Sequence, residues 1–324
     1  MFTTIIMSTS FVNNIVKQVI VEDFEDFFHH LFIQRDIFDR DLNCYLFRGE
    51  ASDTYTLLPN ALRKENVDKL WTYLGGKAKD CETELHQILA ESMILGNFYN
   101  KCNENTLYIS EIKRFNNIFK HDVKLFKKMG KWLPEDLYEL AGLAQHYGLP
   151  TRLLDWTIDI NVALYFAALG SLERGKENEN MVIWALNAFH LEFIKDTDNI
   201  NNIPIQFILP RYVNNPNLAA QKGFFTLWQV DVPNDDSPQV PLDRTPLDQC
   251  IENYVREHES ELGNVLNRVL YKICIPAKYA ADIYEYLLVS GYSSARLFPG
   301  YQGVVKELYD NRLLINIGRR RHNR

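Results

Sequence analysis

The chain has 324 residues, of which 46% are hydrophobic and 24% charged, and its formal net charge is −7. This balance predicts a globular protein and excludes a wholly disordered chain, which would have too few apolar residues to form a core. The acidic body argues against nucleic-acid binding. The exception is the basic run over residues 319–324, which can contact phosphates, although a terminal charge run is more often a solvated end.

Helical periodicity dominates the first half of the sequence. Apolar residues at helical spacing predict an amphipathic helix within residues 21–39 and two further helices over residues 81–99 and 110–128. Between the first two, the apolar run over residues 43–48 stops at Gly49, which predicts a buried strand ending in a turn.

Two more helices are predicted before residue 180. Proline is favoured in the first turn of a helix, so Pro134 predicts a helix from there through Leu143, broken by Gly148. Asp159 predicts the N-cap of another helix, which Gly175 can close.

After residue 180 the pattern changes to a mixture of strands and helices. The strand candidates are residues 181–186, 203–209, 224–232 and 269–275. Residues 234–244 are rich in Asp, Pro and Ser and predict a loop; Pro276 starts a helix ending near Gly291, and Pro299-Gly300 introduces a last helix through Tyr309. This order favours an α+β fold with a small mixed or antiparallel sheet surrounded by helices.

The cysteines and the N-terminus predict a cytoplasmic protein. The five cysteines are scattered, form no Cys-x-x-Cys pair and have no histidine at a zinc-ligand spacing, so we expect no metal. Residues 1–16 lack the basic region and the cleavage site of a signal peptide. Because no apolar run reaches the roughly 18 residues that a membrane span needs, we expect no membrane partner either.

The first candidate site is the tripeptide Phe47-Arg48-Gly49. An arginine at the end of an apolar strand is costly to bury unless it meets an anion or a carboxylate, and its planar guanidinium suits a phosphate or an internal Asp or Glu. Gly49 would let the backbone turn and let another molecule approach it closely. In isolation, a structural ion pair beside a turn glycine explains the tripeptide better than a site does.

The second candidate covers residues 145–157, where polar groups alternate with residues suited to burial. Arg152 and Asp155 can pair with each other or with Arg48. Trp156 offers a flat face for stacking a ring, and His146 can titrate near neutral pH. A packed helix–loop–helix corner with an internal ion pair explains these residues about as well as a ligand pocket does.

The third candidate is the segment 221–228, in which Gln221 could point an amide into the same cleft. A plain strand start is the simpler explanation of this segment. The sequence has no P-loop, no dinucleotide-binding glycine fingerprint and no nucleophile elbow. The residues alone therefore predict nothing more specific than an anion or nucleotide pocket.

Together the three candidates resemble the FRG domain, a family named for an aromatic-Arg-Gly tripeptide. The resemblance also includes residues 143–157, 163–167, 221–226, 275–288 and 297–300, and it spans roughly residues 43–308. It is weakest over residues 64–129. It divides the chain into an N-terminal helical extension (1–40), the FRG domain (41–310, with a helical region at about 64–130) and a basic C-terminal tail (311–324).

A second, weaker resemblance is to the ADP-ribosyltransferases. These enzymes place an aromatic-Arg-Gly tripeptide on a first strand, where the arginine holds NAD and the glycine backbone grips the nicotinamide amide. The resemblance implies NAD as a substrate, Arg48, Tyr165 and Gln221 as catalytic residues, and a role in bacterial toxins or phage defence. The third element of these enzymes is a glutamate, whereas Gln221 can hydrogen-bond a ribose but cannot stabilise a developing cation by charge. The NAD-binding residues implied are Arg48, Gly49, His146, Arg152, Asp155, Trp156 and Thr157.

Three interpretations stay open. In the first, the cleft belongs to an enzyme that transfers ADP-ribose from NAD to an unidentified macromolecule, or that hydrolyses NAD. In the second, a non-catalytic module recognises a nucleotide, a phosphorylated ligand or a nucleic-acid end. In the third, Arg48, Arg152 and Asp155 form a buried ion network that only fixes the fold. Both pocket interpretations fail unless Arg48, Asp155 and Gln221 line one solvent-reachable cleft.

Overall fold

A computed structural model describes residues 7–12, 15–66, 69–70, 82–115, 130–195, 203–213, 215–234, 239–258 and 269–322. Strands over these residues form a mixed eight-stranded sheet and a separate two-stranded sheet. The strands are β1 (Met7–Phe11), β2 (Val16–Val21), β3 (Tyr45–Glu50), β4 (Lys131–Trp132), β5 (Leu154–Thr157), β6 (Asn180–Asn187), β7 (Ile205–Ile208), β8 (Gly223–Trp228), β9 (Val230–Asp231) and β10 (Leu270–Pro276). The large sheet has the order β1-β2-β10-β6-β3-β5-β8-β7, and β4 pairs with β9 in the small one.

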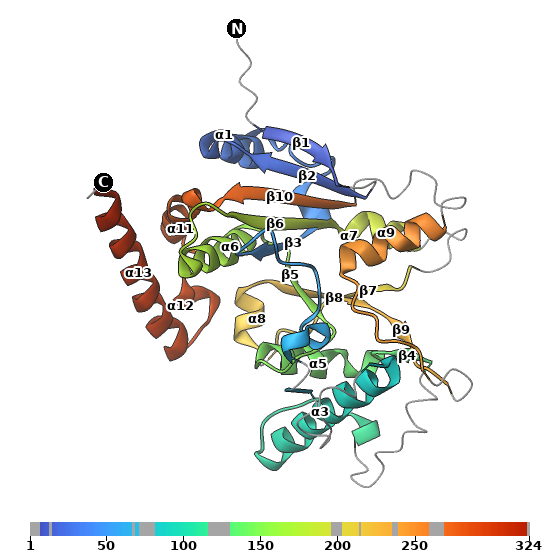
Figure 1. The fold of residues 1–324 in the computed structure, drawn as a ribbon. Coiled ribbons are helices and arrows are strands. Elements are labelled where there is room, and N and C mark those ends of the chain that lie inside the picture. Colours follow the sequence, from blue (N-terminus) through green and yellow to red (C-terminus); the bar gives the residue numbers. More distant parts are fainter. Residues whose placement is uncertain are drawn as a thin grey trace.

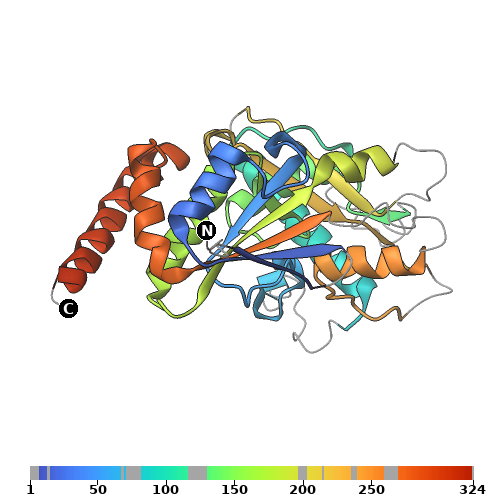
Figure 2. The same cartoon turned by 90° about the horizontal axis from the view of Figure 1, so that it is seen from above.

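Helices cover both faces of the large sheet (Figure 1). They are α1 (Phe24–Phe28), α3 (Glu84–Glu104), α5 (Tyr138–His146), α6 (Ile160–Arg174), α7 (Ala188–Lys195), α8 (Pro216–Ala220), α9 (Leu247–Glu257), α11 (Ala280–Val289), α12 (Ser294–Leu297) and α13 (Tyr301–His322). The core residues place α1, α6 and α11 on one face of the sheet and α7 and α9 on the other. The helices α3 and α5 pack near the β5-β8-β7 end, and α13 stands at the side of the molecule (Figure 2).

The predicted α+β class is confirmed, but the sheet is larger than the sequence pattern indicated. The segment before residue 40 is not purely helical, because it contributes β1 and β2 ahead of α1. The strand β2 pairs in parallel with β10, which brings the N-terminal segment into the central sheet. At the other end of the chain, α13 runs without a break across residue 310, where the basic tail was predicted to begin. No helix in the described ranges combines the length and the apolar character that crossing a membrane requires.

Several predicted elements are found close to their expected bounds. The helix predicted from Asp159 is α6, whose N-cap carboxylate accepts the N–H of Asn161 at 3.0 Å and whose C-cap Gly175 is left-handed with φ 65°. The predicted helix over residues 81–99 is α3. The helix predicted over residues 110–128 begins differently, with a single 3-10 turn at Lys113–Phe115, and residues 116–129 lie outside the described part of the chain.

Strand β3 lies in the middle of the sheet and sends its side chains alternately to the two faces. Tyr45 and Phe47 pack with α6 in one core, whereas Leu46 packs in the core beneath α7 and α9. Because side chains alternate along a strand, Arg48 and Glu50 share the face of Leu46. The sequence of β3 therefore places two charged side chains side by side at the end of a buried strand.

The ladder between β3 and β5 is short. Their antiparallel pairing holds at one position, Phe47 opposite Thr157, whereas β3 pairs with β6 at all six of its positions, as far as Glu50. The turn predicted at Gly49 is therefore wrong, since Gly49 lies inside the paired strand. The hydrogen-bonded pairing of the sheet is interrupted instead between β3 and β5, where the ladder stops after one pair.

Candidate functional site

A cleft of about 450 Å³ lies at the β3–β5 boundary. Its walls come from β3 and the loop after it, from α5, β5 and α6, and from the segments that follow α8 and α12. The lining residues are Phe47, Arg48, Gly49, Glu50, Ala51, Tyr55, Asn60, Gln145, His146, Asp155, Trp156, Thr157, Val162, Ala163, Phe166, Gln221 and Phe298. The requirement that Arg48, Asp155 and Gln221 line one open cleft is therefore met.

Arg48 crosses the boundary between the two strands. Its Nε donates to Glu50 Oε1 at 2.7 Å, and its Nη2 lies 2.7 Å from the same oxygen. Its Nη1 donates to the backbone oxygen of Asp155 at 2.9 Å and lies 3.7 Å from Asp155 Oδ2. Burial lowers the pKa of Arg48, but the two carboxylates outweigh the burial and raise the pKa above its usual value. Arg48 thus supplies a side-chain hydrogen bond where the ladder between β3 and β5 has ended.

Asp155 is held from its other side by an ordered hydrogen-bond chain. Gln145 Nε2 donates to Asp155 Oδ1 at 2.6 Å, and the Thr151 hydroxyl donates to Gln145 Oε1. The Thr151 hydroxyl in turn accepts the N–H of Leu153 at 3.2 Å. The carboxylate nevertheless stays accessible, because 57% of the Asp155 side chain is exposed.

Gly49 lies directly against α6. A Cβ atom at this position would be 1.8 Å from the backbone oxygen of Ala163 and 2.9 Å from the backbone nitrogen of Ala167. Both neighbours are backbone atoms of a helix and cannot rotate away. The glycine is therefore required by the close approach of strand and helix, and the small residues 163 and 167 on α6 complete this contact.

Three other predicted residues also face the cleft with defined partners. The indole N–H of Trp156 donates to Thr226 Oγ1 at 2.8 Å, and the Thr157 hydroxyl donates to the backbone oxygen of Gln221 at 2.8 Å. His146 Nε2 accepts from Asn217 Nδ2 at 2.9 Å. Burial lowers the pKa of His146, although Asp155 opposes this effect, and a neutral imidazole is also what an accepting ring nitrogen requires.

The side chain of Gln221 is held by a hydrogen bond to the end of α12. Its side-chain Nε2 donates to the backbone oxygen of Leu297 at 3.1 Å. The next residue, Phe298, meets Phe166 of α6 edge to face, with ring centroids 6.1 Å apart. The Gln221 amide therefore fixes an aromatic wall of the cleft.

Tyr165 does not line the cleft, contrary to the role implied for it. Its side chain is fully buried on α6, and its hydroxyl meets Ser294 Oγ, which itself donates to Asp310. Burial raises its pKa well above the usual value, although the Ser294 hydrogen bond opposes this effect. The helical phase of α6 explains the difference, because Ala163 and Phe166 face the cleft and Tyr165 then points towards α11 and α12.

Arg152 is also separate from the cleft. It forms a buried ion network with Glu84 and Glu91 of α3, in which its Nε lies 2.8 Å from Glu91 Oε1. The indole N–H of Trp132 donates to Glu91 Oε2 at 2.6 Å. Burial raises the pKa of Glu84, Arg152 opposes this effect, and Glu91 adds to it. The predicted pairing of Arg152 with Asp155 or Arg48 is therefore replaced by a link between α3 and the segment before β5.

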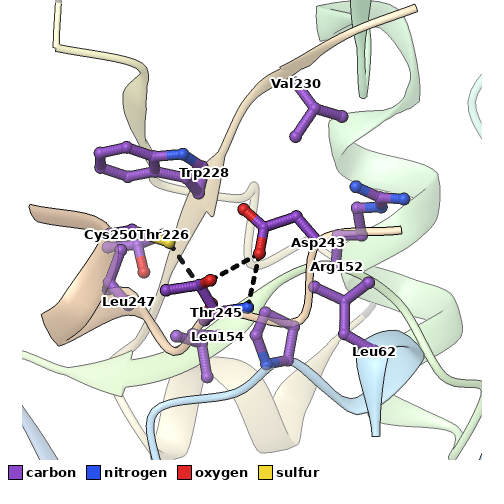
Figure 3. A pocket seen from close by; sticks show the side chains of 11 residues that line it. Leu62, Arg152, Leu154, Thr226, Trp228, Val230, Asp243, Thr245, Leu247 and Cys250 are labelled. Carbon is purple, nitrogen blue, oxygen red and sulfur yellow. Dashed lines mark hydrogen bonds between the residues drawn. The ribbon is translucent and has the colours of Figure 1, made fainter. Parts of the chain in front are cut away.

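Arg152 also borders a second, much smaller pocket, which has a volume of about 30 Å³. Figure 3 shows its wall, where Asp243 and Thr245 are hydrogen-bonded to each other and Trp228 lies nearby. This volume has room for about one or two water molecules. It is too small for a nucleotide, so the cleft beside Arg48 is the better candidate site.

Glu50 is the main cleft residue that sequence reasoning missed. It follows Arg48 by two positions, and the period of a strand puts positions i and i+2 on one face. That signal was present, but the turn predicted at Gly49 removed Glu50 from the strand. Asn60, Tyr55, Phe166 and Phe298 were also missed, because only the three-dimensional fold brings them to the cleft.

The fold and the cleft define an α+β domain whose central strand carries the tripeptide Phe47-Arg48-Gly49. The family model described as the FRG domain matches residues 43–176, so the chain carries an FRG domain over this range. The range contains every cleft-lining residue except Gln221 and Phe298. No curated protein and no solved structure matches the chain. The resemblance to ADP-ribosyltransferases gains no support from these comparisons, and the wider FRG resemblance over residues 177–308 stays a prediction.

Proposed function

We propose that the cleft beside Arg48 and Asp155 binds a nucleotide, with NAD as the ligand to test first. The observation that carries the proposal is the convergence of the three candidate segments, which are far apart in sequence, on one open cleft. Its volume of about 450 Å³ lies within the range of about 300–1,000 Å³ that small-molecule pockets occupy.

The chemistry of the lining suits a ligand with a ring and hydroxyl groups. Phe166 and Phe298 offer aromatic surface, while Asp155 and Asn60 offer polar groups. A nucleoside has both parts, a flat base for the aromatic groups and ribose hydroxyls for the carboxylates.

A catalytic role is the second candidate, and the presence of two carboxylates favours it. Cleavage of NAD breaks the bond between the ribose C1′ and the nicotinamide nitrogen, so nicotinamide leaves and positive charge develops on the ribose. A nearby carboxylate stabilises this charge, and water or a macromolecular nucleophile then bonds to C1′ and loses a proton. Glu50 and Asp155 offer the negative charge that Gln221 lacks. By analogy with enzymes of this activity, the proposal extends to a role in bacterial defence or in a toxin system.

Two observations favour the alternatives. Tyr165, one of the implied catalytic residues, is buried away from the cleft, which suits a non-catalytic binding module. The contacts of Arg48 with Glu50 and with the Asp155 backbone also suit a purely structural role. The experiment must therefore distinguish binding, catalysis and folding.

Calorimetric titration of the purified full chain with NAD tests binding. We expect the wild-type protein to bind and Asp155→Asn, which keeps the shape of the side chain, to bind about tenfold more weakly or worse. Glu104→Gln, an exposed change at the end of α3, is the control for altered net charge and should bind like wild type. Folded wild-type protein that binds no NAD would overturn the proposal.

Release of nicotinamide separates the enzyme from the binding module. A catalytic cleft should release nicotinamide from NAD, and Asp155→Asn should slow the release more than it weakens binding, because the carboxylate acts on the developing charge. Binding without release identifies a binding module. If Arg48→Ala unfolds while folded wild type binds no nucleotide, the ion network is structural.

A further inference from the structure

The cleft has an unusual charge balance for a nucleotide site. Its lining contains one guanidinium, Arg48, and two carboxylates, Glu50 and Asp155. His146, which also lines the cleft, accepts a hydrogen bond at Nε2 and has a lowered pKa, caused by burial and opposed by Asp155, so it adds no positive charge at neutral pH. The described residues of the lining therefore carry an excess of one negative charge.

Arg48 is already occupied by protein groups. The Nε and Nη2 atoms of Arg48 both lie 2.7 Å from one carboxylate oxygen of Glu50. Its Nη1 donates to the backbone oxygen of Asp155. The side chains of Arg48 and Glu50 are only 15% and 12% exposed. A phosphate that reached the guanidinium would have to displace Glu50 and would lie beside two carboxylates, so like-charge repulsion opposes it.

Asp155 is oriented as an acceptor for a ligand. The N–H of Leu153 can only donate, so it fixes the Thr151 oxygen as an acceptor, and the Thr151 proton then goes to Gln145 Oε1. This fixes the orientation of the Gln145 amide, whose NH₂ group donates to Asp155 Oδ1. The second oxygen, Oδ2, makes only the 3.7 Å contact with Arg48 among the described residues, so it can accept from a ligand.

From these contacts we infer that the cleft selects its ligand by positive charge and hydrogen-bond donors, and that it excludes phosphate from Arg48. If NAD is the ligand, as the proposed function states, the end that enters is the ribose with its cationic nicotinamide ring. The diphosphate stays at the open mouth, away from the two carboxylates. Glu50 is the residue that sets this preference, because it pairs with Arg48, the only cation among the described residues of the lining.

Paired titrations test the selectivity. Nicotinamide riboside carries the cationic ring without phosphate, and ADP-ribose carries the diphosphate without the ring. We expect nicotinamide riboside to bind the wild-type chain about tenfold more tightly than ADP-ribose, or better. ADP-ribose binding as tightly as nicotinamide riboside would overturn this inference while leaving nucleotide binding intact. If folded protein binds neither compound and no NAD, the proposed function and this inference both fail.

The variant Glu50→Gln tests the cause. The change keeps the size of the side chain and leaves Asp155 as the remaining carboxylate beside Arg48. The excess negative charge of the lining is thereby removed, so ADP-ribose should bind about tenfold more tightly than it binds wild type, and nicotinamide riboside more weakly. Glu104→Gln removes the same charge from an exposed position on α3 and should change neither affinity. Unchanged selectivity in folded Glu50→Gln would overturn the role of Glu50. The folded state is checked by circular dichroism before each titration.

Discussion

Replacing Gly49 with alanine should separate β3 from α6. The new Cβ atom would lie 1.8 Å from the Ala163 backbone oxygen, whereas a carbon and an oxygen in contact are normally about 3.3 Å apart. One of the two elements must therefore move by about 1.5 Å, and both belong to the same buried core. Added atoms in a packed core typically destabilise by about 1–3 kcal/mol, and contact with rigid backbone puts this case at about 3 kcal/mol or above.

Urea unfolding followed by circular dichroism measures this loss as a change in the free energy of unfolding. Gly96→Ala is the matched control, because Gly96 lies inside α3 and its added Cβ would be 3.4 Å from the Phe115 ring. Alanine is preferred over glycine within a helix by about 1 kcal/mol, so this control should be neutral or stabilising. If the free energy of unfolding of Gly49→Ala lies within about 1 kcal/mol of the wild-type value, the packing explanation is wrong. A role of Gly49 in the close approach of a ligand then regains support.

Three further changes test other parts of the structure. Glu91→Gln should destabilise the chain by about 3 kcal/mol in urea unfolding, because it weakens the pairing of buried Arg152, and a loss below about 1 kcal/mol would contradict that network. Tyr165→Phe should lower the free energy of unfolding by about 1 kcal/mol through the lost Ser294 hydrogen bond and leave NAD titrations unchanged; weaker NAD binding would restore Tyr165 to the site. Burial lowers the pKa of His146 below 6.5, and Asp155 opposes this effect. The unfolded chain therefore binds a proton at His146 more readily than the folded chain does. The stability that is present above pH 6.5 should be lost as the pH falls through the lowered pKa of the folded state. His146→Gln should therefore flatten the decline in Tm between about pH 7.5 and 5, and equal slopes in both proteins would show that another group titrates.

Local signals predicted much of the fold. The caps of α6 at Asp159 and Gly175 were both correct, because a short polar side chain and a left-handed glycine act within one helical turn. The strand β5 was harder to predict, since its four residues include the exposed Asp155 and give no alternation long enough to recognise. The strand β2 pairs with β10, more than 240 residues away in sequence, which no local pattern records, and β1 joins the sheet through β2.

The candidate site was predicted only in part, because contacts between distant segments leave no local pattern in the sequence. Arg48, Asp155 and Gln221 were expected to meet, and they do line one cleft. Arg152 was expected beside them, but its partners Glu84 and Glu91 belong to α3, in the region where the family resemblance was weakest. Tyr165 was assigned from the resemblance of residues 165–167 to a short motif, and a short motif does not determine which side of a helix faces a cleft.

The single paired position between β3 and β5 gives the large sheet an internal line of weakness. On one side lies a ladder of five strands and on the other a ladder of three, joined by the Phe47–Thr157 pair and by Arg48. Strands open most readily where few hydrogen bonds must break together, so amide hydrogen exchange should be fastest at this line and slow within β6. A ligand in the cleft would contact both ladders and hold them together. Ligand binding should therefore slow the amide hydrogen exchange of residues 155–157.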